Sequence, residues 1–253
     1  MVQDLSPPLL AHIEAYLVQK EHCCSGIGAA LRWVWTNHPR SLRVKELFET
    51  VDTFALLVKQ ISMLRADARA ASTAASSTLS DDGAAGSSPA PPKNKDGAKC
   101  CGMEISRIYD LACGHGLLGV LLAQRFKDIE VICVDLVRRD GFDHYKNGFL
   151  QTNASGGAAA ADGGEGWLQP GGAGVGVEGL EGGGDKLIFI EGDMSEVVIQ
   201  PDSFVTCIHA CNEANKTAVA MATAAGAGFM AMPCCIREGI VSQRFAVRYT
   251  RYT

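Results

Sequence analysis

Three glycines and two acidic residues have the types and the spacing of a nucleotide-binding turn. Gly114, Gly116 and Gly119 form the pattern G-x-G-x-x-G directly after a short apolar run. Asp110 ends that run, and Asp135 follows the glycines by about 20 positions, at the end of a β-branched stretch. Glycines permit a tight turn and close approach of a ligand, and an acid at the second strand end can bind ribose hydroxyls. The pattern predicts a βαβ unit that binds a nucleotide-like ligand.

The acidic residues favour one kind of nucleotide ligand. The carboxylate of Asp110 would repel the pyrophosphate of NAD or FAD, but it would attract the amino and sulfonium groups of S-adenosylmethionine. Asp193 closes a later strand, where it can meet an adenine amino group. Leu136 and Met194 can hold the adenine between them, and Ala112 lies in the glycine turn. We therefore expect these residues to form a site for S-adenosylmethionine.

At these residues the sequence resembles the class I S-adenosylmethionine-dependent methyltransferases. The resemblance covers roughly residues 107–237, about half of the chain. The positions that match are Asp110, Gly114 and Gly116 in the first motif of the family, Asp135 as its ribose-binding acid and Asp193 as its adenine-binding acid. The segments IHACNEANK and MPCC look like one divergent branch, which has His-Ala-Cys after the fourth strand and Pro-Cys-Cys after the fifth. The resemblance implies methyl transfer, with RNA or protein favoured over a metabolite as acceptor.

Candidates for the transfer step follow the fourth and fifth expected strands. His209 can act as a general base because the pKa of histidine is near neutral, or it can be a hydrogen-bonded wall residue. Asn212 and Glu213 can hold an amine or hydroxyl acceptor. Cys234 can add to carbon 5 of a pyrimidine, as in other covalent catalysis, or it can shape the pocket. The Asn-Pro-Pro-Tyr type of motif used for exocyclic amines is absent.

The composition indicates an intracellular protein with reduced thiols. The chain has 253 residues, a formal net charge of −5 and ten cysteines. Several cysteines form adjacent pairs and no C-x-x-C spacing occurs, so we expect neither a disulfide framework nor a metal site. No secretory signal or membrane span is expected, and the cytoplasm is the predicted compartment, with the nucleus as the alternative. The net charge neither supports nor excludes binding to nucleic acid.

The elements that position these residues can be read from hydrophobic periodicity. A helical N-terminal extension is expected over 1–69, with Ser6 and Ser41 as helix caps. A disordered linker rich in Ala, Ser, Gly and Pro is expected over 70–98. The catalytic domain would cover 99–253, with a low-complexity insertion at 152–185. Within it we expect strands at 108–111, 130–136, 186–191, 203–210 and 229–232 and helices at 117–126, 137–151 and 213–225.

Strands that alternate with helices predict an α/β fold with a Rossmann-like, doubly wound and mostly parallel sheet. A full class I domain has two further strands, but after Cys235 the remaining residues can supply only one. The sheet is therefore expected to be incomplete or its edge covered by other elements, such as the N-terminal helices. Those helices can form a lid over the site or a packing extension.

Two other function classes remain open. A non-catalytic interaction module would keep the fold, and perhaps the cofactor, without activity; the short C-terminal region favours it and the intact acidic residues oppose it. An NAD-dependent oxidoreductase is opposed by Asp110, by the strand end at Asp193 and by the lack of a Tyr-x-x-x-Lys pair.

Overall fold

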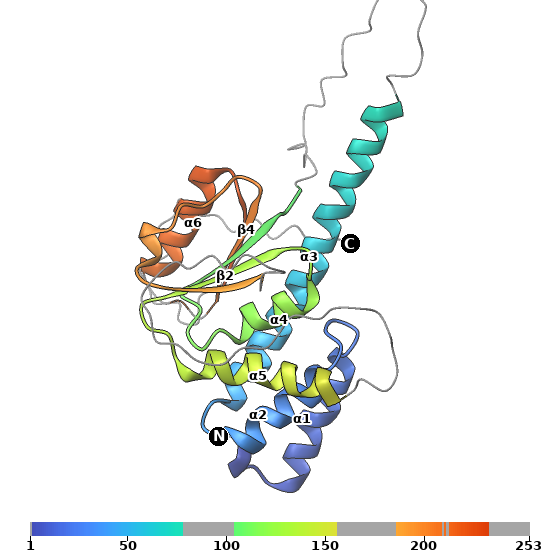
Figure 1. The fold of residues 1–253 in the computed structure, drawn as a ribbon, viewed down its shortest axis with the longest axis vertical. Helices are drawn as coiled ribbons and strands as arrows, with labels where there is room; N and C mark the ends of the chain where they lie inside the picture. Colours follow the sequence, from blue (N-terminus) through green and yellow to red (C-terminus); the bar gives the residue numbers. More distant parts are fainter. Residues whose placement is uncertain (1, 78–103, 156–185, 209, 211–212, 233–253) are drawn as a thin grey trace, which may run out of the picture.

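A computed structural model describes residues 2–77, 104–155, 186–208, 210 and 213–232. These residues form a parallel sheet of five strands with helices on both faces, preceded by three helices (Figure 1). The predicted Rossmann-like α/β fold is thereby confirmed for this part of the chain.

The strands lie in the order β3-β2-β1-β4-β5, and all neighbours are parallel. Their bounds are β1 Arg107–Leu111, β2 Glu130–Asp135, β3 Leu187–Glu191, β4 Ser203–Ile208 and β5 Gly228–Met232. The central strands β1, β2 and β4 are almost entirely buried, as their continuous apolar runs require. The strand order reverses between β1 and β4, where doubly wound sheets bind their ligands.

Helices cover both faces of the sheet. Their bounds are α1 Pro7–Lys20, α2 Ile27–Asn37, α3 Val44–Ser77, α4 Leu117–Arg125, α5 Asp140–Ser155 and α6 Glu213–Ala225, with short 3₁₀ turns η1 Val2–Asp4 and η2 Met194–Glu196. Helix α6 packs on β4 and β5, and α4 packs on the other face against β1, β2 and β3. Each face therefore has its own apolar core.

The N-terminal helices belong to the larger of these cores. Helix α2 packs along α5 and α3 packs along α4, as Figure 1 shows below the sheet. Ile13, Leu31 and Phe54 from the three helices are fully buried in the same apolar cluster as Ile108 of β1. The N-terminal helices therefore share an apolar core with the sheet.

One of the two predicted helix caps is wrong. Ser41 does not cap α3, which begins at Val44; its hydroxyl lies 2.6 Å from Nδ1 of His144, and its carbonyl accepts a hydrogen bond from the Tyr145 hydroxyl. Ser6 is the N-cap residue of α1, as predicted, although its side chain makes no capping hydrogen bond. Its carbonyl oxygen accepts from the amides of Leu9 and Leu10 instead.

The predicted linker begins too early in the sequence. Residues 70–77 are helical and continue α3, whereas 78–98 lie outside the described residues. Alanine is the best helix former, so an Ala-rich segment next to an established helix extends it. The hydroxyls of Ser72 and Thr73 donate to carbonyls one turn earlier, each at 3.0 Å.

Helix α5 is displaced relative to the prediction at both ends. It begins at Asp140 rather than Val137, because the amides of Val137 and Arg138 donate to the carboxylates of Asp135 and Glu191. It runs to Ser155, so the first residues of the expected 152–185 insertion are helical. Residues 156–185 and the chain after Met232 lie outside the described residues.

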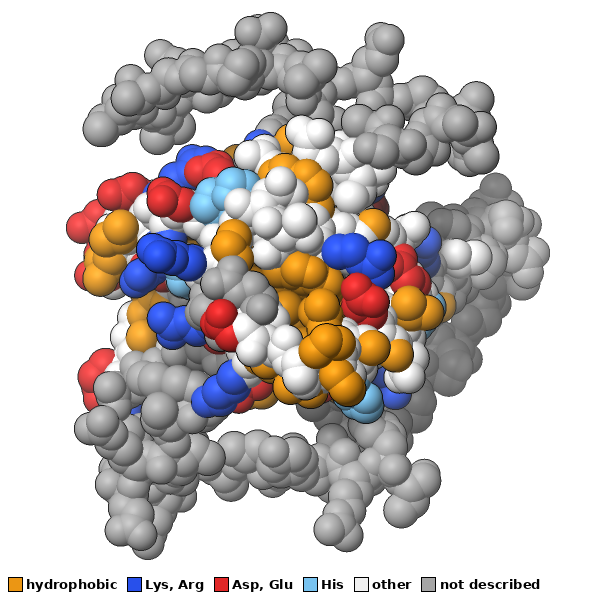
Figure 2. Space-filling model, turned by 90° about the horizontal axis from the view of Figure 1, so that it is seen from below, with side chains coloured by type: hydrophobic (Ala, Val, Ile, Leu, Met, Phe, Trp, Pro, Cys, Tyr) orange, Lys and Arg blue, Asp and Glu red, His pale blue; other side chains and the backbone are white. Residues whose placement is uncertain are grey.

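The surface around the N-terminal helices is of mixed character. Seen from the end of the molecule formed by α1 and α2, apolar side chains are bordered by charged ones (Figure 2). Leu9 and Val18 of α1 are exposed apolar residues. Within the described part of the chain, none of the helices has the length and apolar character that crossing a bilayer requires.

Candidate functional site

A cavity of about 350 Å³ opens at the carboxyl edge of the sheet, between β1 and β4. One wall is the turn from Ala112 to Gly116 with the first residues of α4, and Asp135 lies at the end of β2. The cavity falls in the size range of small-molecule sites and lies at the switch point of the strand order. We take it as the candidate functional site.

The glycine turn has the backbone conformation that its sequence predicts. Gly114 and Gly116 have φ values of +60° and +72°, in the left-handed region that glycine adopts without steric cost. A side chain on Gly116 would lie 2.5 Å from Cδ2 of Phe142. Ala112 shares the left-handed conformation with φ +54°, which is unfavourable for a residue with a Cβ. Backbone strain of this kind is concentrated at functional sites.

Gly119, the third glycine of the pattern, lies outside the cavity wall and allows α4 to pack against the sheet. A Cβ on Gly119 would lie 2.1 Å from Sγ of Cys133 on β2. The absence of a side chain therefore lets α4 lie close against the sheet, as the third glycine of such patterns does.

Asp135 joins the glycine turn to the second strand. Its Oδ2 accepts a hydrogen bond from the Gly114 amide at 2.8 Å, and it is one of the cavity wall residues. Its Oδ1 has a longer contact, 3.5 Å, with the Val137 amide. A carboxylate has four acceptor sites, so Asp135 keeps capacity to accept hydrogen bonds from a ligand. The structure thus brings together Ala112, Gly114, Gly116 and Asp135, as predicted.

Asp110 lies behind the turn instead of in the cavity wall. It is fully buried between β1 and α4, and its Oδ2 accepts from the Gly119 amide at 3.1 Å. Its Oδ1 has no hydrogen-bond partner among the described residues. Burial raises the pKa of Asp110 to about 7, outweighing the lowering effect of the Gly119 bond, and the nearby charge of Asp135 adds to the rise.

The residues expected around an adenine lie outside the cavity walls. Leu136 is 68% exposed, and Met194 packs against the core on the α6 face. Asp193 is exposed and caps η2, because its Oδ1 accepts from the amide and the hydroxyl of Ser195, both at 2.8 Å. These bonds lower the pKa of Asp193. The Gly192 amide donates to the Asp135 carbonyl at 2.9 Å, which keeps this strand end beside β2.

Most of the expected catalytic residues cannot be placed. His209, Asn212 and Cys234 lie outside the described residues. Glu213 begins α6, but its side chain is exposed and forms an ion pair with Lys216 at 2.8 Å. Ala210, between the unplaced positions, is buried and lines the cavity.

The N-terminal and central helices supply wall residues that the sequence patterns did not single out. Glu46 and Thr50 come from the first two turns of α3, and Tyr145 comes from α5. Thr50 is buried, and burial raises the pKa of Tyr145 far above its ordinary value. A buried threonine one turn after an acid, on an otherwise apolar helix face, is the signal that could have indicated this wall. His115, also in the wall, has a pKa lowered mainly by burial.

The described cavity walls carry two carboxylates, Glu46 and Asp135, and no lysine or arginine. The nearest partner of Glu46 is Arg43, with Nη1 3.3 Å from the carboxylate. The third amide of α4, which could otherwise bind an anion, donates to Asp110. The cavity therefore suits a ligand with a cationic group better than one with a pyrophosphate.

Among the described residues, no three His, Cys, Asp or Glu side chains are grouped so that they could bind a metal ion. The described cysteines are free thiols: Cys23, Cys24, Cys113, Cys133 and Cys207. Burial raises the pKa of Cys24 and of Cys207 to about 12, so these two are not reactive thiolates at neutral pH.

The sequence matches no protein-family model, no curated protein and no solved structure. The geometry of the cavity therefore carries the functional argument.

Proposed function

We propose that the protein is an S-adenosylmethionine-dependent methyltransferase that binds its cofactor in the cavity at the carboxyl edge of the sheet. The observation that carries the proposal is the charge of the described walls, which have two carboxylates, a histidine whose pKa is lowered, and no lysine or arginine, beside a glycine turn at the switch point. S-adenosylmethionine has a sulfonium and an ammonium group and no phosphate, so it matches this charge.

Four of the wall residues have a role in this proposal. The backbone of Gly114 and Gly116 permits close approach of the methionine part. Asp135 accepts hydrogen bonds from the ribose hydroxyls, and charge-assisted bonds of this kind are the stronger ones. Glu46 can pair with the ammonium group in exchange for its solvent-exposed ion pair with Arg43. Helix α3, from the N-terminal extension, thereby completes the cofactor site.

The chemistry needs little more from the protein than alignment. When bound, the cofactor would supply an activated methyl group for transfer to an acceptor atom that has a lone pair. The protein must hold the acceptor in line with the methyl group and accept its proton where it carries one. We assign the acceptor to the RNA or protein class on the resemblance to the His-Ala-Cys and Pro-Cys-Cys branch. His209 stays the proposed base, and Asn212, Glu213 and Cys234 stay proposed acceptor-site residues.

Calorimetric titration with S-adenosylmethionine and with NAD tests the proposal. We expect the protein to bind S-adenosylmethionine and not NAD. Asp135→Ala should weaken binding about tenfold or more, because a hydrogen bond to a charged group is lost. Asp67→Ala, which removes an exposed carboxylate from the solvent side of α3, is the matched control and should leave the affinity unchanged. Absence of S-adenosylmethionine binding by the folded wild-type protein would refute the proposal.

A further inference from the structure

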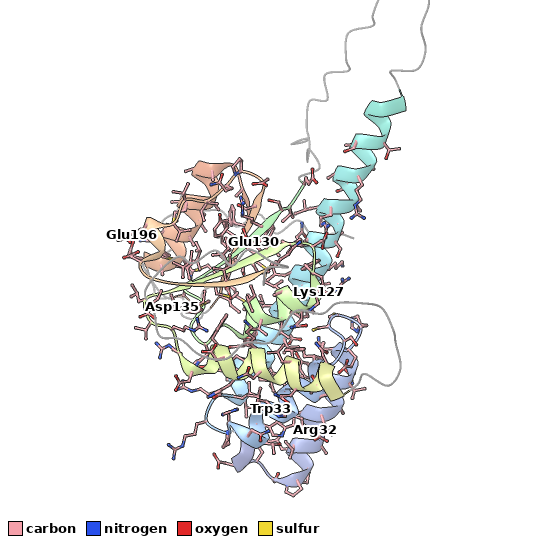
Figure 3. All side chains as sticks on the ribbon, in the orientation of Figure 1. Arg32, Trp33, Lys127, Glu130, Asp135 and Glu196 are labelled. Atoms are coloured by element: carbon pink, nitrogen blue, oxygen red, sulfur yellow. The ribbon has the colours of Figure 1, made fainter. Side chains whose placement is uncertain are left out.

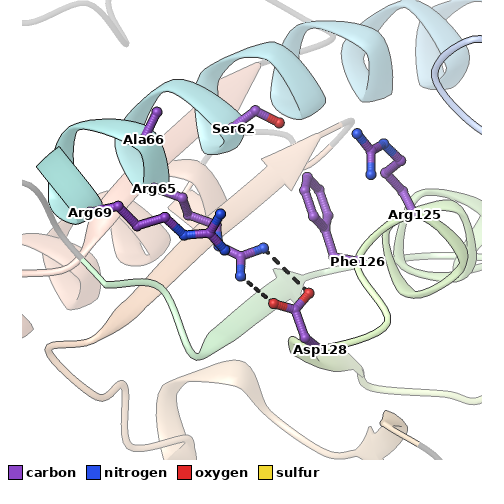
Figure 4. Close-up of a pocket in the computed structure, with 7 residues that line it drawn as sticks. All are labelled: Ser62, Arg65, Ala66, Arg69, Arg125, Phe126 and Asp128. Carbon is purple, nitrogen blue, oxygen red and sulfur yellow. Dashed lines mark hydrogen bonds and ion pairs between the residues drawn. The ribbon is translucent and has the colours of Figure 1, made fainter.

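A second, smaller groove is rich in arginine. It lies near the amino ends of the strands, opposite to the cavity at their carboxyl ends. Arg65 and Arg69 project from α3, and Arg125 ends α4 (Figure 4). Phe126 and Asp128 complete the groove on the loop that leads into β2, and its volume is about 200 Å³. None of these residues belongs to the cavity described above.

The charges in the groove are unbalanced. Asp128 is its one acidic wall residue, and Arg65 binds it with both terminal nitrogens, Nη1 at 3.3 Å from Oδ1 and Nη2 on Oδ2. This pair lowers the pKa of Asp128. Of the three groove arginines, Arg65 has an ion pair with a described residue, and Arg69 and Arg125 have none among the described residues. Lys186 adds a further positive charge beside the loop, since its Nζ donates to the Asp128 carbonyl at 2.9 Å.

The groove is built on well-packed elements. Phe126 is buried beneath it, and the guanidinium of Arg125 lies 5.4 Å from the centre of the Phe126 ring. Helix α3 packs on α4, and arginines of both helices line the same groove. Guanidinium groups offer forked donors that match the geometry of phosphate oxygens.

The size and position of the groove limit what it can bind. Its volume is below the range of sites that enclose a whole small-molecule ligand, so it suits an anionic group rather than a nucleoside. It lies at the amino ends of the strands, beside Lys127, whereas Asp135 lies at the other end of β2 (Figure 3). A strand of this length spans roughly 20 Å, so an anion in the groove cannot take part in chemistry at the cavity.

We propose that the groove formed by Arg65, Arg69 and Arg125 is a binding site for a phosphate group, supplied either by the backbone of a single-stranded RNA or by a free phosphate. This inference does not depend on the proposed function.

The test is a binding titration of the whole chain with a fluorescent oligouridine, followed by anisotropy at several salt concentrations. Inorganic phosphate and pyrophosphate are titrated separately and as competitors. The test variant is Arg69→Gln/Arg125→Gln. The matched control is Arg32→Gln/Arg40→Gln, which removes the same charge at exposed positions near α2. Asp128→Asn, which removes the competing carboxylate, is the variant with the opposite expected effect.

We expect the test variant to lose about tenfold or more in affinity for the anionic probe, because charge-assisted hydrogen bonds are removed. The control should change by less than about twofold, and Asp128→Asn should bind more tightly. With RNA, the plot of log affinity against log salt concentration has a negative slope. In the test variant the magnitude of this slope should decrease by about 1.4, because each of two lost phosphate contacts contributes ~0.7. Binding of phosphate without oligouridine would identify a free phosphate as the ligand; binding of oligouridine would identify RNA.

Equal losses in the test variant and the control would overturn the proposal, since they would reflect net charge alone. So would a wild-type protein that binds none of the probes at physiological salt. Binding of S-adenosylmethionine is measured in parallel and should be the same in all variants. A result that refutes the phosphate-binding groove can therefore be distinguished from one that refutes the proposed cofactor site.

Discussion

Asp110 is a carboxyl group held in the core beside the cavity. Its neighbours across the sheet are Cys133 of β2 and Thr206 of β4, and all three residues are fully buried. The Gly119 amide is its one described hydrogen-bond donor. Burial of a charge with so few partners favours the protonated acid, which explains the raised pKa.

This pKa predicts a specific dependence of stability on pH. Between about pH 4 and about pH 7 the folded protein keeps a proton on Asp110 that the unfolded chain releases, so Asp110 makes the free energy of unfolding fall as pH rises. At ~1.4 kcal/mol per pKa unit, the loss approaches roughly 4 kcal/mol above pH ~7. Asp110→Asn keeps an acceptor for the Gly119 amide and removes the titration.

The measurement is urea unfolding of the wild type and of Asp110→Asn at about pH 5 and about pH 8. The free energy of unfolding of Asp110→Asn, relative to that of the wild type, should be higher at about pH 8 than at about pH 5. Thr206→Val is the control, because Thr206 is the buried neighbour of Asp110 on β4 and has no titrating group. The effect of this substitution on stability should not depend on pH. A difference between wild type and Asp110→Asn that is independent of pH would contradict the buried, protonated Asp110.

At the residue scale, spacing alone predicted part of the candidate site. The glycine turn and Asp135 lie within one βαβ unit, so their relative positions follow from local geometry. Glu46 and Tyr145 could not be found in this way. They reach the cavity through packing of α3 and α5 across the sheet edge, which no short-range spacing encodes.

At the scale of elements, the turn before α4 depends on the absence of a side chain. Gly116 has φ +72° and faces Phe142 of α5, whereas Gly226, which follows α6, has φ +69° and open space around its Cβ direction. The two glycines therefore share one backbone conformation but differ in packing.

Substitution of each glycine by alanine separates these effects. Gly226→Ala should cost about 1–2 kcal/mol of stability for the left-handed backbone alone. Gly116→Ala should cost about 1–3 kcal/mol more, because its Cβ would overlap Phe142 and force α4 and α5 apart. Thermal and urea unfolding measure both. Equal costs at the two positions would contradict the close packing of the turn on α5.

Element types were predictable, and most strand ends were correct within one or two residues. Buried parallel strands are continuous apolar runs that stop at glycine or acid, and these signals are local. Helix boundaries were less predictable, because they depend on hydrogen-bond partners and neighbouring segments that the local sequence does not specify. Ser41 bonds to His144 rather than to the start of α3, and the Ala-rich residues 70–77 extend a helix instead of beginning a linker.

At the scale of the whole molecule, the N-terminal helices pack directly against the helices that cover the sheet. Helix α2 packs on α5 so closely that a side chain on Gly148 would lie 2.8 Å from the Ala30 carbonyl oxygen. The ring of His38, after α2, stacks on His144 of α5 with centroids 3.6 Å apart. Such contacts join segments more than a hundred residues apart, so the sequence patterns could not show them.

This packing predicts a single unfolding transition. Trp33 and Trp35 lie on α2. The third tryptophan, Trp167, is replaced by Phe, so that fluorescence reports on the N-terminal helices, whereas far-ultraviolet circular dichroism reports on the described helices and strands together. The two signals should change together in urea. Gly148→Ala should lower the midpoint of both, and Gly192→Ala, with open space at its Cβ, should not. Separate transitions would mean that the helices form an independent domain.

The most direct test of the central claim is an NMR titration of the glycine amides with S-adenosylmethionine. The claim is that the cofactor lies against the turn at the carboxyl edge of the sheet. We predict that the amide resonances of Gly114 and Gly116 shift on titration, while that of Gly226, at the opposite edge, does not. Unchanged Gly114 and Gly116 resonances at saturating cofactor would contradict the claim, and so would shifts no larger than those of Gly226.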